Sequence, residues 1–104
     1  MFFLEKLSKH DTGVMQLARM VEDEYDRLER NVKIYSKKDR MIAEADLIGF
    51  KDGYADIYEV KCSYRPTKAR MQLKKLKKVL SPKIKIRNTY FFPMNVDQII
   101  LLSL

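Results

Sequence analysis

The chain has 104 residues, the size of one compact domain, so we expect residues 1–104 to form a single domain. Apolar residues make up 46% of it, and no apolar run approaches the roughly 20 residues that cross a bilayer, which excludes disordered and membrane-spanning classes. One Cys and one His exclude disulfide scaffolds and four-ligand zinc sites, and the net charge of +7 favours a polyanionic partner such as nucleic acid.

The N-terminal half predicts one helix followed by a strand. The first residues lack the basic leader and long apolar region of a secretory signal, so we expect a soluble, cytoplasmic protein. Apolar residues recur with helical spacing from Asp11 to about Arg30, and Asp11 or Thr12 suits the N-cap. The alternating run Val32–Tyr35 then predicts a short strand.

The remaining elements follow in an alternating order. Two β-prone runs, Met41–Phe50 and Tyr54–Cys62, flank an Asp-Gly pair, which is the strongest short-range signal for a hairpin. A second helix is predicted from Pro66 to Leu80. Further strands are expected at Ile84–Ile86 and Val96–Leu102, the latter buried on both faces. The predicted order is α-β-β-β-α-β-β, an α/β fold.

Positive charge is concentrated in the second half. Acidic residues outnumber basic ones 13 to 10 before Val60, whereas Asp97 is the sole acidic side chain from Val60 onwards, against 11 Lys and Arg. The block is either an ordinary solvated face or a surface that contacts phosphates of DNA. The predicted phosphate contacts are Arg65, Lys68, Arg70, Lys74, Lys75 and Lys78.

The predicted hairpin brings ionisable side chains together. If Asp52-Gly53 is its two-residue turn, Asp46 lies opposite Glu59 and Glu44 lies opposite Lys61, all on one face. Two opposed carboxylates repel each other unless a cation lies between them.

Oxygen ligands with open positions suit Mg²⁺ or Mn²⁺, and a lysine beside the ion can orient water and stabilise charge on a phosphate. This pattern points to phosphodiester hydrolysis. The alternative is a Glu44–Lys61 ion pair, with Asp46 and Glu59 at a solvated strand end.

The spacing of these residues is similar to a known signature. Asp46, twelve intervening residues and then Glu59-Val60-Lys61 resembles the Asp…Glu-x-Lys motif of the PD-(D/E)XK, or restriction-endonuclease-like, nuclease superfamily. The flanking sequences, Ala45–Phe50 and Ile57–Cys62, look most like the archaeal Holliday junction resolvase and its relatives. The resemblance implies an α-β-β-β-α-β core, with a mixed central sheet flanked by helices.

The resemblance also implies roles. Asp46 and Glu59 would bind the metal together with the main-chain carbonyl of Val60, and Lys61 would be the catalytic lysine. Many relatives carry an acidic residue on the first helix, where this chain has Leu17. Glu22 is an auxiliary candidate for that acidic residue. Some relatives also carry a Gln on the helix after the lysine, and Gln72 is the auxiliary candidate for it.

We therefore expect a magnesium-dependent or manganese-dependent DNA endonuclease, with no membrane partner. Because so small a chain presents little surface, it is expected to act as a homodimer, through the C-terminal apolar strand or through residues Met1–Leu4. The alternatives are a nucleic-acid-binding module that keeps the fold but does not cut, and a structural or protein-interaction domain.

Overall fold

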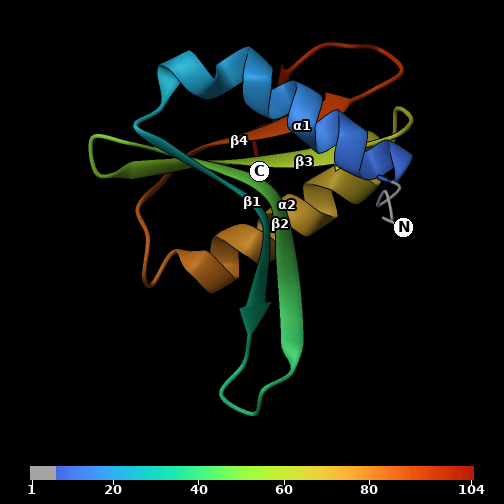
Figure 1. The fold of residues 1–104 in the computed structure, drawn as a ribbon. Coiled ribbons are helices and arrows are strands. Elements are labelled where there is room, and N and C mark those ends of the chain that lie inside the picture. Colours follow the sequence, from blue (N-terminus) through green and yellow to red (C-terminus); the bar gives the residue numbers. More distant parts are fainter. Residues whose placement is uncertain (1–6) are drawn as a thin grey trace, which may run out of the picture.

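A computed structural model describes residues 7–104 as an α/β fold with two helices and a five-stranded mixed sheet (Figure 1). The strand order is β1-β2-β3-β4-β5, and β3 and β4 form the parallel pair while the other neighbours are antiparallel. The element order agrees with the predicted α-β-β-β-α-β-β. The bounds are α1 Lys9–Val21, a 3₁₀ turn Glu22–Glu24, β1 Arg27–Tyr35, β2 Met41–Lys51, β3 Tyr54–Lys61, α2 Pro66–Leu80, β4 Ile86–Pro93 and β5 Ile100–Leu101.

The two helices cover opposite faces of the sheet, as Figure 1 shows. The buried stripe of α1, centred on Leu17, packs with Tyr58 and Phe92. The buried stripe of α2, centred on Leu73, packs with Ile57 and Phe91 on the other face. Neighbouring residues of β3 and β4 thus contribute to both cores, which fixes the central strands between the helices.

The first helix differs from its prediction at both ends. It begins at Lys9, because Ser8 is the N-cap and forms a capping box with Asp11. It ends at Val21 rather than near Arg30, since the acidic run Glu22–Glu24 is unfavourable at the negative end of the helix dipole. Leu28, whose spacing extended the helical pattern, lies in β1 and packs into the core under α1.

Strand β2 changes its environment midway along its length. It pairs with β3 from Leu47 to Lys51, but with β1 over almost its full length. Ala45 packs into the core of α2 and Leu47 into the core of α1, although two residues on a regular strand share a face. Asn31 on β1 adopts φ = 52° at the same level. The β1–β2 ribbon therefore bends at Asn31 and Asp46 and leaves the sheet (Figure 1).

The C-terminal strands also differ from the prediction. The strand expected at Ile84–Ile86 begins instead at Ile86 and runs to Pro93 as β4, which carries the buried Phe91 and Phe92. The strand predicted at Val96–Leu102 is reduced to Ile100–Leu101 at the sheet edge, with Leu101 59% exposed. The strand buried on both faces is thus β4. Over residues 7–104, no helix is long and apolar enough to cross a membrane.

Candidate active site

The β2–β3 hairpin has the predicted register. Lys51 pairs with Tyr54 and Leu47 with Tyr58, around a turn in which Asp52 and Gly53 both have positive φ, as a type I′ turn requires. Counted away from the turn, the last pair of the ladder is Leu47 with Tyr58, so the pairing ends one residue short of Asp46. The strands separate there, so the predicted site lies at the fork between them.

Asp46, Glu59 and Lys61 come together at this fork. One oxygen of Asp46, Oδ2, accepts a hydrogen bond from the main-chain N–H of Val60 at 2.8 Å. Nζ of Lys61 lies 3.5 Å from Oε1 of Glu59. Asp46 is 6% exposed and Glu59 is 4% exposed, so both carboxylates lie almost out of water.

The environment of Glu59 disfavours its charge. Burial, and then repulsion by Asp46, raise the pKa of Glu59 from 4.5 to about 8, although the Lys61 ammonium acts in the opposite direction. One ammonium therefore does not compensate the pair. The residues at the fork can stabilise an added positive charge, either a proton or a metal ion.

His10 also reaches this site. Its Nε2 lies 3.0 Å from the carbonyl oxygen of Val60 and 3.3 Å from Oδ2 of Asp46. His10 is not among the residues predicted for the site, because the contact joins residues that are fifty positions apart. The one available signal was its place at the start of the first helix. The imidazole engages the same carbonyl that the family resemblance implies as a metal ligand.

Glu44 and Gln72 lie elsewhere, and the predicted Glu44–Lys61 pairing is wrong. The pairing of β2 with β3 stops at Leu47, so Glu44 is not paired with β3, and its partner is Lys33 on β1. Glu44 and Gln72 instead line a cleft of about 140 Å³ between β2 and α2, which Lys75 also lines.

Glu22 does not join the site. It is exposed and follows the C-terminal end of α1, whereas His10 is near the N-terminus. The separation of twelve positions corresponds to about 18 Å of helix, at 1.5 Å per residue. The first helix thus contributes a histidine to the fork, and the auxiliary candidate Glu22 lies away from it.

The predicted phosphate contacts are all exposed but face two sides of α2. Arg65 is the N-cap residue, four positions after Lys61. Helical spacing places Lys68 with Lys75, on the side of the cleft toward β2. Arg70 donates a hydrogen bond to the carbonyl of Ser103, on the other side of α2. Helical spacing places Lys74 on the same side as Arg70, and Lys78 opposite the buried stripe of the helix. One duplex cannot contact all of them.

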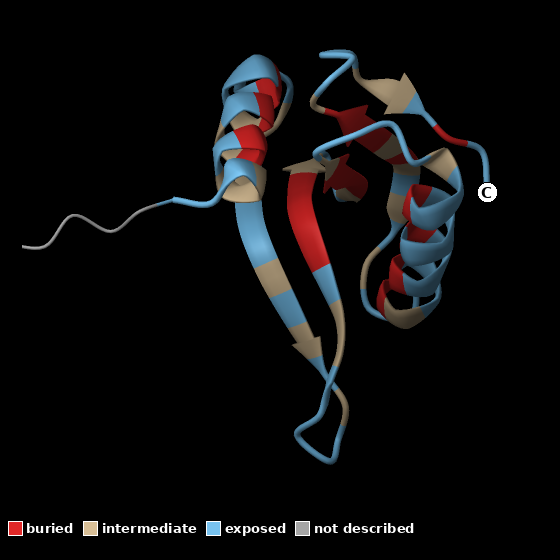
Figure 2. Cartoon of the chain, turned by 90° about the vertical axis from the view of Figure 1, so that its right-hand side faces the viewer, coloured by how far each residue is buried: buried red, intermediate tan, exposed pale blue. Residues whose placement is uncertain are grey.

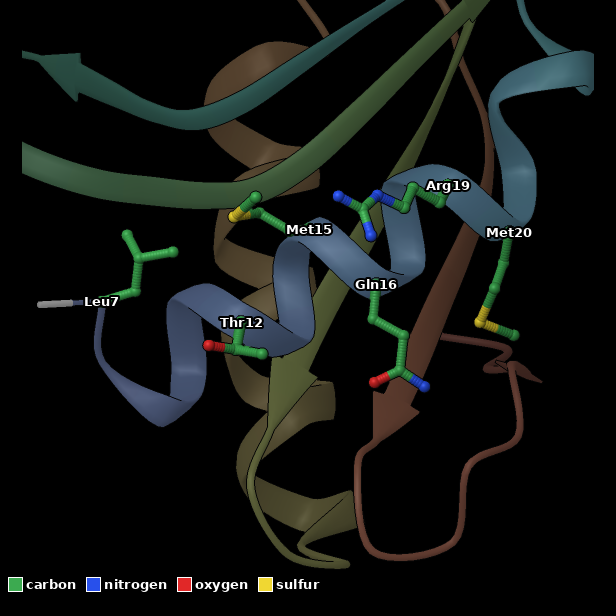
Figure 3. A pocket seen from close by; sticks show the side chains of 6 residues that line it. All are labelled: Leu7, Thr12, Met15, Gln16, Arg19 and Met20. Carbon is green, nitrogen blue, oxygen red and sulfur yellow. The ribbon is translucent and has the colours of Figure 1, made fainter.

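A larger groove lies away from the fork, along the outer face of α1 (Figure 3). It has a volume of about 400 Å³ and is mainly apolar, with Met15 and Met20 among its lining side chains. None of the site residues lines it. Residues Met1–Leu4, one of the two predicted dimer surfaces, lie outside the described residues. The other, the C-terminal strand, exposes Leu101.

The donor atoms at the fork fit a hard divalent cation. Within residues 7–104, no three His, Cys, Asp or Glu side chains converge as a ready-made metal site. Two buried carboxylates and a main-chain carbonyl are nevertheless an all-oxygen set, and Mg²⁺ commonly binds through one or two carboxylates while keeping several waters. The raised pKa of Glu59 reflects first its burial and then repulsion by Asp46, and a cation would relieve that repulsion.

Comparison with known proteins gave no family for the chain. Neither the models of protein families nor the curated protein sequences produced a match. The functional interpretation therefore rests on the residues at the fork and on their geometry.

Proposed function

We propose that the chain is a metal-dependent DNA endonuclease of the restriction-endonuclease-like fold, selective for DNA structure in the manner of a junction resolvase. The observation that carries this proposal is the meeting of two buried carboxylates with a lysine at the fork between β2 and β3. A purely structural site would be expected to pair each buried carboxylate with a cation.

Asp46, Glu59 and the carbonyl of Val60 would hold Mg²⁺ or Mn²⁺. Such an ion supplies Lewis-acid polarisation of a phosphate oxygen and lowers the pKa of a bound water. The N–H of Val60 orients the Asp46 carboxylate by its hydrogen bond. The contact with Glu59 holds the Lys61 ammonium at the fork, where it would orient the attacking water and stabilise negative charge developing on the phosphate.

The surroundings favour a nucleic-acid substrate. The fork lies at the carboxyl end of β3, where the parallel pair with β4 ends at Lys61 and Pro93. Ligands of open α/β sheets bind beyond the carboxyl ends of strands. Arg65 and the N-terminus of α2 follow directly, and both attract phosphate. A homodimer would place two such sites on two strands of a junction.

Cleavage of a labelled panel tests the proposal. Four-way junction, flap, duplex and single-stranded DNA are incubated with Mg²⁺, Mn²⁺ or EDTA. We expect cutting that needs the metal and falls about 10²-fold or more in Lys61→Ala and in Asp46→Ala. Lys83→Ala removes an exposed lysine beyond the far end of α2 and should cut like the wild type. Cutting that persists in both site variants would show that the nuclease site lies elsewhere.

One observation favours a second function, a nucleic-acid-binding module that does not cut. His10 already engages both Asp46 and the Val60 carbonyl. If this contact replaces a metal, the chain should bind DNA in a salt-dependent manner with no cleavage of any substrate. His10→Ala should then leave the protein equally unable to cut.

A further inference from the structure

The bent part of the β1–β2 ribbon, residues 32–45, stands apart from the sheet, and we call it the arm. Its two strands pair with each other, from Val32 opposite Ala45 to Tyr35 opposite Met41. The pairing of β2 with β3 begins only at Leu47. Figure 1 shows the arm extending away from the sheet, and Figure 2 shows that its outer half is exposed or half-buried. The outer half of the arm therefore contributes little to the core.

The tip of the arm presents positive charge on an ordered turn. Lys37, Lys38 and Arg40 are all exposed there, against the single carboxylate of Asp39. Among the described residues, none of these three cations forms an ion pair. The Ser36 hydroxyl accepts hydrogen bonds from the main-chain N–H groups of Lys38 and Arg40, which holds the turn in place. Three unpaired cations on a fixed turn suit a row of phosphates.

The base of the arm is fixed against α2. Ile34 and Ala43 are partly buried against the core of that helix. The cleft lined by Glu44, Gln72 and Lys75 lies between the two elements. The arm therefore stands beside the side of α2 that carries Lys75, and the arm's own charged side chain at the cleft is Glu44.

The arm also begins at the candidate active site. Asp46 directly follows the arm on β2, and Arg40, just before β2 begins, lies six positions earlier in the chain, which corresponds to about 20 Å of extended strand. That length spans about six base pairs of duplex, at 3.4 Å per pair along one strand. A duplex with a phosphate at the fork would therefore reach the tip.

We propose that the arm is a second DNA-binding element, whose basic tip grips the duplex backbone about six base pairs from the fork. Its position relative to the reacting phosphate rests on the proposed function, whereas its affinity for DNA does not. A second copy of the chain is a poorer occupant, because three cations of one tip would approach those of another.

The test compares two triple variants with the same loss of charge. Lys37→Ala/Lys38→Ala/Arg40→Ala removes the cations of the tip. Arg19→Ala/Lys83→Ala/Lys85→Ala removes three exposed cations from α1 and from the segment before β4. Fluorescence anisotropy in EDTA gives the affinity of each protein for a 30-base-pair duplex and for a four-nucleotide strand at several salt concentrations. Circular dichroism checks that both variants are folded.

We expect the tip variant to bind the duplex about tenfold or more weakly, with a salt slope smaller by about 2 to 3, since each lost phosphate contact removes about 0.9. The short strand cannot span 20 Å, so the tip variant should bind it like the wild type. The control variant should keep the steep slope. Equal duplex binding by the two variants would overturn the proposal.

Two further outcomes separate this inference from the nuclease proposal. If the wild type cuts no DNA but the tip variant still loses duplex affinity, the arm is upheld and the nuclease proposal fails. If the wild type cuts DNA and the tip variant binds like the control, the arm is rejected alone. A change of mass in light scattering of the tip variant, with unchanged DNA affinity, would assign the arm to self-association and reject a DNA role.

Discussion

Two buried carboxylates on β3, Asp56 and Glu59, have contrasting environments. Asp56 accepts hydrogen bonds from both Arg87 and the hydroxyl of Tyr25, and from the main-chain N–H of Asn88. Burial raises the pKa of Asp56, but the hydrogen bonds from Arg87 and Tyr25 more than offset this, so its pKa lies below the usual range. Asp56 is therefore a satisfied structural group, whereas Glu59 has one ammonium and a neighbouring carboxylate.

The raised pKa of Glu59 predicts a dependence of stability on pH in metal-free protein. The folded protein binds the Glu59 proton more tightly than the unfolded chain does, so this residue stabilises the fold fully below about pH 4.5. That contribution is lost as the pH rises through about 8. Urea unfolding in EDTA should thus show Glu59→Gln gaining on the wild type between pH 5 and pH 9, by on the order of a few kcal/mol. A constant difference between the two proteins would contradict the raised pKa.

The sequence predicts the central residues of the site because their approach is local. The Asp52-Gly53 turn fixes the register, and this places Asp46 and Glu59 at the same level of the hairpin. His10 could not be found in this way, since its contact depends on how α1 packs over the sheet. Glu44 was misplaced because a regular hairpin was assumed to continue through the bend at Asp46.

At the scale of elements, the predicted bounds of a helix or strand are accurate where particular residues mark its start and its end. Helix α2 begins at Pro66 and ends at Leu80 as predicted, since a proline opens it and Ser81-Pro82 follows it. Strand β4 was largely missed, because its partner is the parallel strand β3, separated from it by the whole of α2. After Ile86, its next residues Arg87, Asn88 and Thr89 are polar, so no alternating pattern marks them.

The bend that creates the arm predicts a specific tolerance at Asn31. This residue has φ = 52°, a left-handed conformation that glycine adopts freely and β-branched residues strongly avoid. We expect Asn31→Val to lower the free energy of unfolding by roughly 1–3 kcal/mol and Asn31→Gly to be nearly neutral. Urea unfolding of the two variants measures both values. Equal destabilisation by Val and Gly would show that the side chain of Asn31, rather than its backbone, supports the bend.

At the scale of the whole molecule, the fork lies where four elements meet. The bend of β2, the end of β3 and the start of α1 supply Asp46, Glu59 and His10, and α2 begins a few residues beyond Lys61. Lys75 of α2 and Glu44 of β2 line the cleft between these two elements, and the cations of the arm lie beyond it at the tip. Sequence composition predicts the excess of positive charge, but its division between α2 and the arm depends on the bend in the ribbon.

The most direct test of the account is a calorimetric titration of metal-free protein with Mn²⁺. The wild type should bind the ion, and Asp46→Ala should lose that binding. Lys61→Ala should retain the binding, because the lysine acts on water and phosphate rather than on the ion. If the wild type binds Mn²⁺ no better than Asp46→Ala does, the paired carboxylates are not a metal site and the central claim is wrong.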